Sequence, residues 1–171
     1  MCPHGKIPMM SAATAETYDL FDTPCHLVRL ALKRAYDIFL EEVGSAGLTP
    51  PQFSIVLAVH QNPRIKQYDL VKLTGSDRST VAELVGRLVA RGFLVRKRLK
   101  DDQRVNRLLT TEEGEASLLN SISGAITAEE RIIAPIPEDK REDFINCLKL
   151  IADLGPPTME NRPQLSTQRP Q

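Results

Sequence analysis

The 171-residue sequence predicts a mainly α fold with a small β-hairpin. Apolar residues recur at helical spacing through most of residues 20–154, which indicates amphipathic helices. Two short β-type runs, 93–98 and 105–110, follow two helical patterns that are separated by a short turn. The order helix, turn, helix, hairpin is that of a winged helix-turn-helix. The helices outside this segment predict an additional helical dimerisation region.

The second helical pattern, which ends at Gly92, has the features of a recognition helix. Ser76 or Asp77 can cap its N-terminus, because a short side-chain oxygen accepts hydrogen bonds from first-turn N–H groups. Gly92 supplies the left-handed residue that commonly follows a helix. One face is apolar, with Val81, Leu84, Val85 and Leu88. The opposite face is polar, as base contact requires, with Ser79, Thr80, Glu83 and Arg87.

Basic residues are concentrated in this helix and the hairpin that follows it. Residues 78–107 contain nine Lys and Arg against three Asp and Glu, a net charge of +6, whereas the whole chain has 22 of each sign. A local basic patch on an acidic body is typical of a protein that binds double-stranded DNA. The alternative is a solvated basic hairpin without a partner. We expect DNA contacts from Arg78, Ser79, Thr80, Glu83, Arg87, Arg96, Lys97, Arg98, Lys100, Asp102 and Arg104.

Several motifs resemble those of the MarR-type transcriptional regulators. They are Asp77-Arg-Ser-Thr-Val81, Leu84-Val-x-Arg-Leu-Val-x-Arg-Gly92, Asp102-x-Arg104, Thr111-x-x-Gly114 and Leu48-Thr-Pro-Pro-Gln-Phe53. The resemblance covers about residues 20–154. It implies a DNA-binding winged helix at 48–114 and dimerisation helices at 20–47 and 115–154. It also implies that Arg104 lies in or beside the minor groove, where Asp102 could orient it.

Two positions depart from the family pattern. Thr110 stands where a Leu is usual, which is a mild change. Glu83 stands where many members carry a basic or small residue. The base read at this position is therefore open.

Capping residues and the spacing of apolar residues predict the first two helices of the chain. Thr23-Pro24 predicts the start of a long first helix, which runs to Val43 and is apolar on two faces. One small domain cannot cover two apolar faces, so we expect a homodimer; the alternative is a central core helix of a monomer. Thr49-Pro50-Pro51-Gln52 is a capping box with Pro at the first helical position. Its helix should end near Asn62-Pro63 and bury Phe53, Val56 and Leu57.

The remaining helices, a short strand and the two tails can be predicted in the same way. Ile65 could add a short strand to the wing, and residues 67–73 form the first helix of the helix-turn-helix, docked by Leu70 and Leu73. Thr111 caps a long helix that Pro135 and Pro137 end, and the last helix covers 138–154. Apolar positions of the long helix are Leu118, Leu119, Ile122, Ala125, Ile126, Ile132 and Ile133. We expect a flexible tail at 1–19 and a disordered, Pro- and Gln-rich tail at 155–171.

Motifs for catalysis are missing from the sequence. It has no Gly-rich phosphate loop, His-Glu-x-x-His, Cys-x-x-Cys or nucleophile elbow, so we expect neither an enzyme nor a metal or cofactor site. No apolar run reaches 18 residues and residues 1–10 lack the apolar segment of a signal peptide. Three cysteines without metal-type spacing fit a reducing compartment. We therefore expect a cytoplasmic protein.

The resemblance also implies a small-molecule effector, since members of the family often bind anionic aromatic compounds beside the dimer helices. Arg29, Lys33 and Tyr36 on the first helix are the expected contacts for an aromatic acid or its coenzyme A thioester. Arg29 and Lys33 are four residues apart and share a helix face; a solvated basic strip is the alternative. The expected function is a homodimeric repressor, released from operator DNA by this effector.

Two other functions remain open. Cys25 lies near the start of the first helix, where a thiol ionises more readily, so a thiol-based redox sensor on the same fold is one alternative. A small, partly buried Cys25 without a redox role is the simpler interpretation. The other alternative is a winged-helix module that binds proteins and not DNA.

Overall fold

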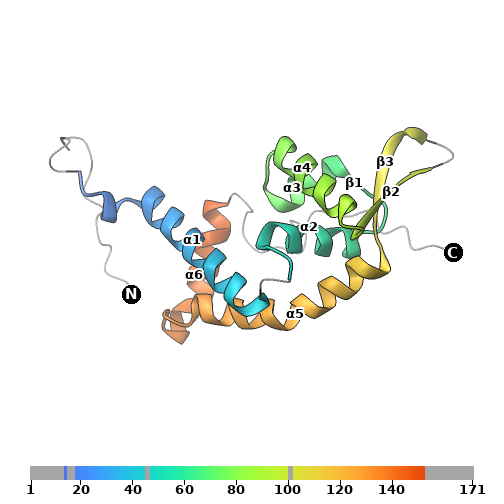
Figure 1. The fold of residues 1–171 in the computed structure, drawn as a ribbon. Coiled ribbons are helices and arrows are strands. Elements are labelled where there is room, and N and C mark those ends of the chain that lie inside the picture. Colours follow the sequence, from blue (N-terminus) through green and yellow to red (C-terminus); the bar gives the residue numbers. More distant parts are fainter. Residues whose placement is uncertain (1–13, 15–17, 45–46, 100–101, 153–171) are drawn as a thin grey trace. The chain divides into compact units, whose positions relative to one another are not determined.

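The computed structural model describes Thr14 and residues 18–44, 47–99 and 102–152, without the side chains of 98–106. Within these residues the chain forms six α-helices, a short 3-10 helix and a three-stranded antiparallel sheet (Figure 1). The elements are the 3-10 helix Leu20–Asp22, α1 Pro24–Val43, α2 Pro50–Gln61, β1 Ile65–Lys66, α3 Gln67–Thr74, α4 Arg78–Ala90, β2 Leu94–Leu99, β3 Asp102–Thr110, α5 Glu112–Ile133 and α6 Glu138–Ile151. The expected fold class is confirmed.

The chain divides into two compact units between Arg34 and Ala35. In the first unit, Asp19 Oδ1 accepts a hydrogen bond from the Phe21 N–H at 2.9 Å and so caps the 3-10 helix. The first turns of α1 follow and begin at Pro24, as expected. Of the predicted tail 1–19, only Thr14, Tyr18 and Asp19 are described, and the predicted tail 155–171 lies outside the described residues.

The second unit has its main core where α2, α3 and α4 meet the sheet and the start of α5. Its buried residues are Leu48, Ile55, Val56, Val59, Ile65, Leu70, Val81, Val85, Leu88, Leu94, Leu108 and Leu118. The capping box is present, with Gln52 Oε1 accepting from the Thr49 N–H at 3.2 Å. Phe53 and Leu57 are only half-buried, however, and Ile55 and Val59 are buried instead. The reason is that α2 is packed on several sides, by α3, α4, α5 and β3.

The sheet has the order β1-β3-β2. Ile65 pairs with Leu108, so the expected short strand exists. The second strand of the hairpin begins at Asp102 and not at Val105. Pairing continues to Leu99 and Asp102 through a register shift after Arg98, and a charged residue can join a strand when its neighbours are paired.

Thr111 and Gly114 join the base of the hairpin to α5. Thr111 Oγ1 donates to the Gly92 carbonyl oxygen at 2.5 Å and accepts from the Gly114 N–H at 3.0 Å. A Cβ at Gly114 would lie 2.0 Å from the Phe93 carbonyl oxygen, so only glycine fits. Gly92 has φ 77°, the left-handed conformation that its position after α4 predicts. The hydrogen bonds of Thr111 and the close backbone contact at Gly114 therefore explain the Thr111-x-x-Gly114 motif.

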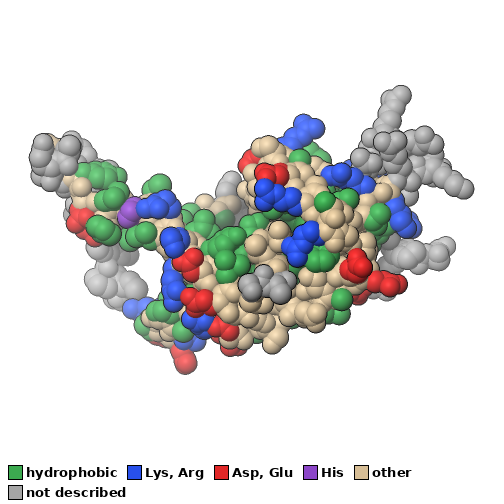
Figure 2. Space-filling model, viewed as in Figure 1, with side chains coloured by type: hydrophobic (Ala, Val, Ile, Leu, Met, Phe, Trp, Pro, Cys, Tyr) green, Lys and Arg blue, Asp and Glu red, His purple; other side chains and the backbone are tan. Residues whose placement is uncertain are grey.

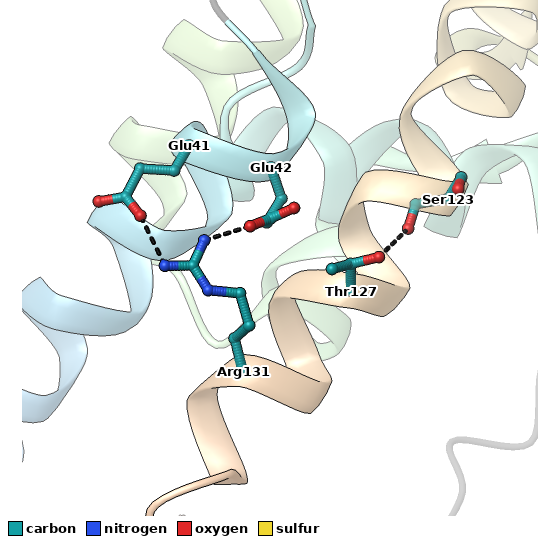
Figure 3. Close-up of polar contacts among 5 residues, drawn as sticks. All are labelled: Glu41, Glu42, Ser123, Thr127 and Arg131. Atoms are coloured by element: carbon teal, nitrogen blue, oxygen red, sulfur yellow. Dashed lines mark hydrogen bonds and ion pairs between the residues drawn. The ribbon is translucent and has the colours of Figure 1, made fainter.

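A second cluster of buried residues, Ile38, Phe39, Ala125 and Ala128, lies where the end of α1 meets α5. Beside it, Arg131 donates to Glu42 Oε1 and, at 2.9 Å, to Glu41 Oε2 (Figure 3). The same figure shows Thr127 Oγ1 donating to the Ser123 carbonyl oxygen at 3.2 Å. The two ion pairs of Arg131 tie the C-terminal end of α1 to the last turn of α5, whereas the Thr127 hydrogen bond lies within α5.

Several apolar side chains on the last two helices are not covered within the chain. On α5, Leu118 and Ala125 are buried as expected, but Leu119 is 59% and Ile126 56% exposed. The last helix ends at Ile151, three residues before the expected end, and none of its residues is buried. No helix in the described part of the chain has the length and apolar content needed to cross a bilayer.

Candidate nucleic-acid interface and adjoining cavity

The helix-turn-helix is formed by α3 and α4. The turn begins at Gly75, whose φ of 64° ends α3. Leu70 of α3 and Val81, Val85 and Leu88 of α4 are completely buried. Each such side chain contributes about 1.5–3 kcal/mol through the removal of apolar surface from water. The polar face of α4 is therefore fixed relative to the core and faces solvent.

Asp77 caps α4 and also binds the first two side chains of its polar face. Its Oδ1 accepts from the N–H groups of Ser79 and Thr80, both at 2.9 Å. The Ser79 hydroxyl donates to the same oxygen, and the Thr80 hydroxyl donates to Oδ2 at 2.6 Å. These hydrogen bonds, with that of the Ser79 hydroxyl the strongest, hold the pKa of Asp77 well below its usual range. Toward solvent, the two hydroxyl groups therefore offer oxygen lone pairs.

Glu83 and Arg87 form an ion pair one turn apart on the same helix. Nη2 of Arg87 donates to Oε1 of Glu83, and the two side chains are 64% and 62% exposed. Arg78 and Ser79 are also exposed, and Thr80 is half-buried. The structure thus places all five predicted α4 contacts on or next to one accessible surface.

The hairpin supplies further cations. Arg96 and Lys97 are exposed, whereas the side chains of Arg98, Lys100, Asp102 and Arg104 lie outside the described residues. On the face seen in Figure 2, Lys and Arg side chains lie over the helix-turn-helix and the base of the hairpin. The predicted pairing of Asp102 with Arg104 stays a prediction.

Besides Arg87, two of the described basic residues in this segment contact other groups of the protein. The guanidinium of Arg91 stacks on the Phe93 ring at 4.4 Å, and Nη1 donates to Gln52 Oε1 at 3.3 Å. Arg107 donates to the Arg64 carbonyl oxygen at 3.2 Å. The sequence charge count treats them like the other cations, although their contacts hold them against the protein.

Two residues of α3 were missed by the sequence argument. Tyr68 is 63% exposed, and Lys72 Nζ lies 5.2 Å from the centre of its ring. An aromatic residue four positions before a lysine on the first helix of a helix-turn-helix was the available signal. The pair adds one exposed cation and one phenol to the surface that α3 presents.

A cavity of about 340 Å³ lies beside the helix-turn-helix. Most of its wall comes from α2: Pro50, Phe53, Ser54, Leu57, Ala58 and Gln61. Phe39 of α1, Leu73 of α3 and Glu129 of α5 complete it together with Asn62. The rings of Phe39 and Phe53 meet edge to face, with centroids 5.5 Å apart. The cavity is partly open to solvent and is lined by apolar and aromatic groups with a few polar ones.

The predicted effector contacts are at other positions. Arg29 and Lys33 belong to the first unit and Tyr36 to the second, and all three are exposed. Nη2 of Arg29 lies 3.2 Å from Nδ1 of His26. The cavity residues were not recognised from the sequence because they come from separate elements that only the fold brings together.

Cys25 is exposed, not partly buried as its simpler interpretation expected. Cys147 of α6 is exposed as well. Among the described residues, no three His, Cys, Asp or Glu side chains gather in a way that could hold a metal ion.

Comparison with known proteins places this geometry in a family. Residues 46–105 match the MarR family. The PcaV transcriptional regulator of Streptomyces coelicolor, solved with its natural ligand, is 30% identical, with 83% of this chain and 97% of PcaV covered and a TM-score of 0.73.

Two further solved structures are similar over almost their whole length. BpsR of Bordetella bronchiseptica, whose DNA binding is regulated by 6-hydroxynicotinic acid, is 25% identical (80% of this chain, 97% of BpsR, TM-score 0.75). The transcriptional repressor CouR, solved with a 23-mer DNA duplex, is 28% identical (82% and 99%, TM-score 0.71), and CouR was also solved with p-coumaroyl-CoA. The chain belongs to the MarR family of transcriptional regulators.

Proposed function

We propose that this MarR-family regulator is a homodimeric repressor that leaves its operator when an aromatic acid or its coenzyme A thioester binds. The observation that carries the proposal is the cavity beside the helix-turn-helix. One of its walls, Leu73, belongs to α3, whereas Phe39 and Glu129 belong to the α1–α5 contact. A ligand in this position touches both the DNA-binding helices and the helices behind them.

Such a ligand can change DNA affinity only if it binds one arrangement of these helices better than another. Moving α3 also moves α4, because the two share buried contacts through Leu70 and Val81. Both recognition helices of a dimer must fit the operator together. A small displacement of α3 is therefore sufficient to weaken binding.

The size and aromatic lining of the cavity support an aromatic ligand, whose acidic group would have to face away from Glu129. A volume of about 340 Å³ is at the small end for ligand sites and accommodates one substituted aromatic ring. Phe39 and Phe53 offer aromatic faces, and Ser54, Gln61 and Asn62 offer polar groups for ring substituents. Related proteins respond to 6-hydroxynicotinic acid or bind p-coumaroyl-CoA. Arg29, Lys33 and Tyr36 stay proposed contacts for the acid or the thioester phosphates on the strength of the sequence resemblance alone, since none of them lines the cavity.

Uncovered apolar residues support the dimer. On α6, Leu150 is 64% and Ile151 67% exposed, and on α1 Leu32 is 68% exposed. Apolar side chains concentrated on terminal helices mark an association surface. A second copy of the chain would cover them, as the two apolar faces of α1 predict.

Mobility shift with DNA from the region upstream of the gene tests the regulator, and light scattering tests the dimer. Aromatic acids and their thioesters are then added to the complex. Ser54→Trp should fill the cavity, so this variant should bind DNA like the wild type but no longer respond to the effector. A monomer at micromolar concentration would overturn the dimer, and an unchanged response of Ser54→Trp would overturn the cavity as the effector site.

The two alternatives give different results in the same assay. A thiol sensor would release DNA on addition of peroxide, and Cys25→Ser would abolish the release. A protein-interaction module would bind no operator fragment at low salt. In our proposal DNA binding is strong at low salt and insensitive to replacement of Cys25.

A further inference from the structure

Glu83 is an acidic residue on the surface that meets DNA. A carboxylate near phosphates is repelled, so its position requires an explanation. It does not belong to the cap, which Asp77 provides, and it is exposed and not part of the core beneath α4. Within the part of the chain that the structure describes, Arg87 pairs with one of its oxygens, and its side chain is 62% exposed. Glu83 is therefore held through one oxygen and accessible to a ligand.

The residues around Glu83 also present acceptors. Ser79 and Glu83 are four positions apart, and Arg87 follows after four more, so the three form one row along the helix. The hydroxyl protons of Ser79 and Thr80 are both donated to Asp77. Toward solvent, the first two turns of this row offer the hydroxyl oxygens and the Glu83 carboxylate. The acceptors among these residues need hydrogen-bond donors opposite them.

The floor of the major groove offers two kinds of donor, the N4 amino group of cytosine and the N6 amino group of adenine. In adenine the amino group lies beside N7, an acceptor that repels a carboxylate. In cytosine it lies beside the C5–H group, which does not. Guanine and thymine present the acceptors O6, N7 and O4. A carboxylate on a recognition helix therefore favours cytosine.

We propose that Glu83 accepts a hydrogen bond from the N4 amino group of a cytosine in each operator half-site and that Arg87 positions it. The ion pair with Arg87 orients the carboxylate and offsets its charge beside the phosphates. This inference rests on the proposed function, because it requires α4 to enter the major groove.

The test starts with selection of bound duplexes from a random-sequence library, using wild type, Glu83→Gln, Glu83→Ala and Arg87→Met. Glu130→Gln, an exposed substitution on α5, removes the same negative charge and serves as the control. Wild type and control should select cytosine at one symmetric position of each half-site. Glu83→Gln should shift this position toward adenine, since an amide can donate to N7. Glu83→Ala should show no preference there.

A second measurement replaces the selected cytosine by N4-methylcytosine, which pairs normally but puts a methyl group in place of the major-groove donor. Wild-type affinity should fall at least about fivefold per half-site, the lower limit for one specific base contact, and Glu83→Ala affinity should not change. Arg87→Met should retain only part of the cytosine preference. Circular dichroism checks that each variant keeps its helices.

The outcomes distinguish a failure of the role of Glu83 from a failure of the proposed operator binding. If no sequence is enriched by the wild type, the proposed operator binding fails. If a half-site is enriched but Glu83→Gln and Glu83→Ala keep its base preferences at every position, the role of Glu83 is overturned. A full cytosine preference in Arg87→Met would overturn the positioning role of Arg87.

Discussion

Gly124 of α5 and Glu42 of α1 bring the backbones of their helices into direct contact. A Cβ added at Gly124 would lie 2.6 Å from the Glu42 carbonyl oxygen and 3.0 Å from the Val43 Cα. Both neighbours are main-chain atoms, so no side-chain rotation can make room. The end of α1 can approach α5 this closely only because residue 124 has no side chain.

We expect Gly124→Ala to force α1 and α5 apart and to lower the free energy of unfolding by about 1–3 kcal/mol, the usual cost of overpacking. Denaturant unfolding at a fixed protein concentration measures it, since the stability of the proposed dimer would depend on concentration. The matched control is Gly86→Ala on α4, where a Cβ would meet nothing within 4 Å. Alanine is the better helix former, so this control should gain about 0.5–1 kcal/mol. Equal effects of both substitutions would contradict the close contact.

Arg131 of α5 also links the end of α1 to α5, through ion pairs with two glutamates. It binds Glu41 and Glu42 at once, and these hydrogen bonds, the one to Glu42 first, raise the pKa of its guanidinium. Arg131→Gln should lower the melting temperature at low salt, because two adjacent carboxylates lose their shared cation. Glu41→Gln should have a smaller effect, since the half-buried Glu42 keeps its partner.

Salt provides the check on this prediction. Exposed ion pairs are screened as ionic strength rises. The difference in melting temperature between wild type and Arg131→Gln should therefore shrink between roughly 0.05 and 1 M salt. A difference that stays constant would mean that Arg131 acts through packing and not through charge.

Asp77 should make the stability of α4 depend on acid pH. Its pKa is lowered in the folded protein from the ordinary value of 3.8. A group of this kind contributes stability that is fully present above its unfolded pKa and is lost as the pH falls toward the folded pKa. The wild type should therefore lose stability below about pH 4 more steeply than a variant without this carboxylate.

Asp77→Asn is the suitable variant, because Asn also caps helices but does not titrate. Unfolding measured from pH 7 to pH 2 should show the wild type more stable at neutral pH, with the difference shrinking in acid. Parallel curves would show that Asp77 has the same pKa in the folded and unfolded chain.

Features that depend only on neighbouring residues could be predicted from the sequence. The caps at Thr49, Asp77 and Thr111, and the helix stop at Gly92, each depend on a few neighbouring residues, and the structure has all four. The start of β3 at Asp102 depends on a strand partner and was placed three residues late. Pattern alone could not show it, since strand formation by charged residues depends on what pairs with them.

The features of the candidate site also divide into those set by neighbouring residues and those set by the fold. The apolar stripe of α4 implied its polar face, and therefore the accessible positions of Glu83 and Arg87. The cavity depends on Phe39, Leu73 and Glu129 meeting across three helices, a contact that no spacing rule contains. The hydrogen bonds of Ser79 and Thr80 to Asp77, which orient their hydroxyl groups, follow from cap geometry and could have been predicted from the sequence.

The wing carries the last prediction, which rests on the sequence motif Asp102-x-Arg104. Arg104→Ala should weaken operator binding by about 1–3 kcal/mol per contact, with two copies in a dimer, and leave thermal stability nearly unchanged. Asp102→Ala should act in the same direction but less, because the cation survives and only its orientation is lost.

The double variant distinguishes orientation from independent action. If Asp102 acts through Arg104, the double variant should bind DNA like Arg104→Ala alone, since removing the cation leaves nothing to orient. Arg96→Ala removes an exposed cation of β2 outside the motif and is the control. Its loss of DNA-binding free energy should add to that of Asp102→Ala. Mobility shift at several salt concentrations gives all these affinities, and each lost phosphate contact should reduce the salt slope by about one. Additivity of Asp102→Ala and Arg104→Ala would show that the carboxylate does not orient the arginine.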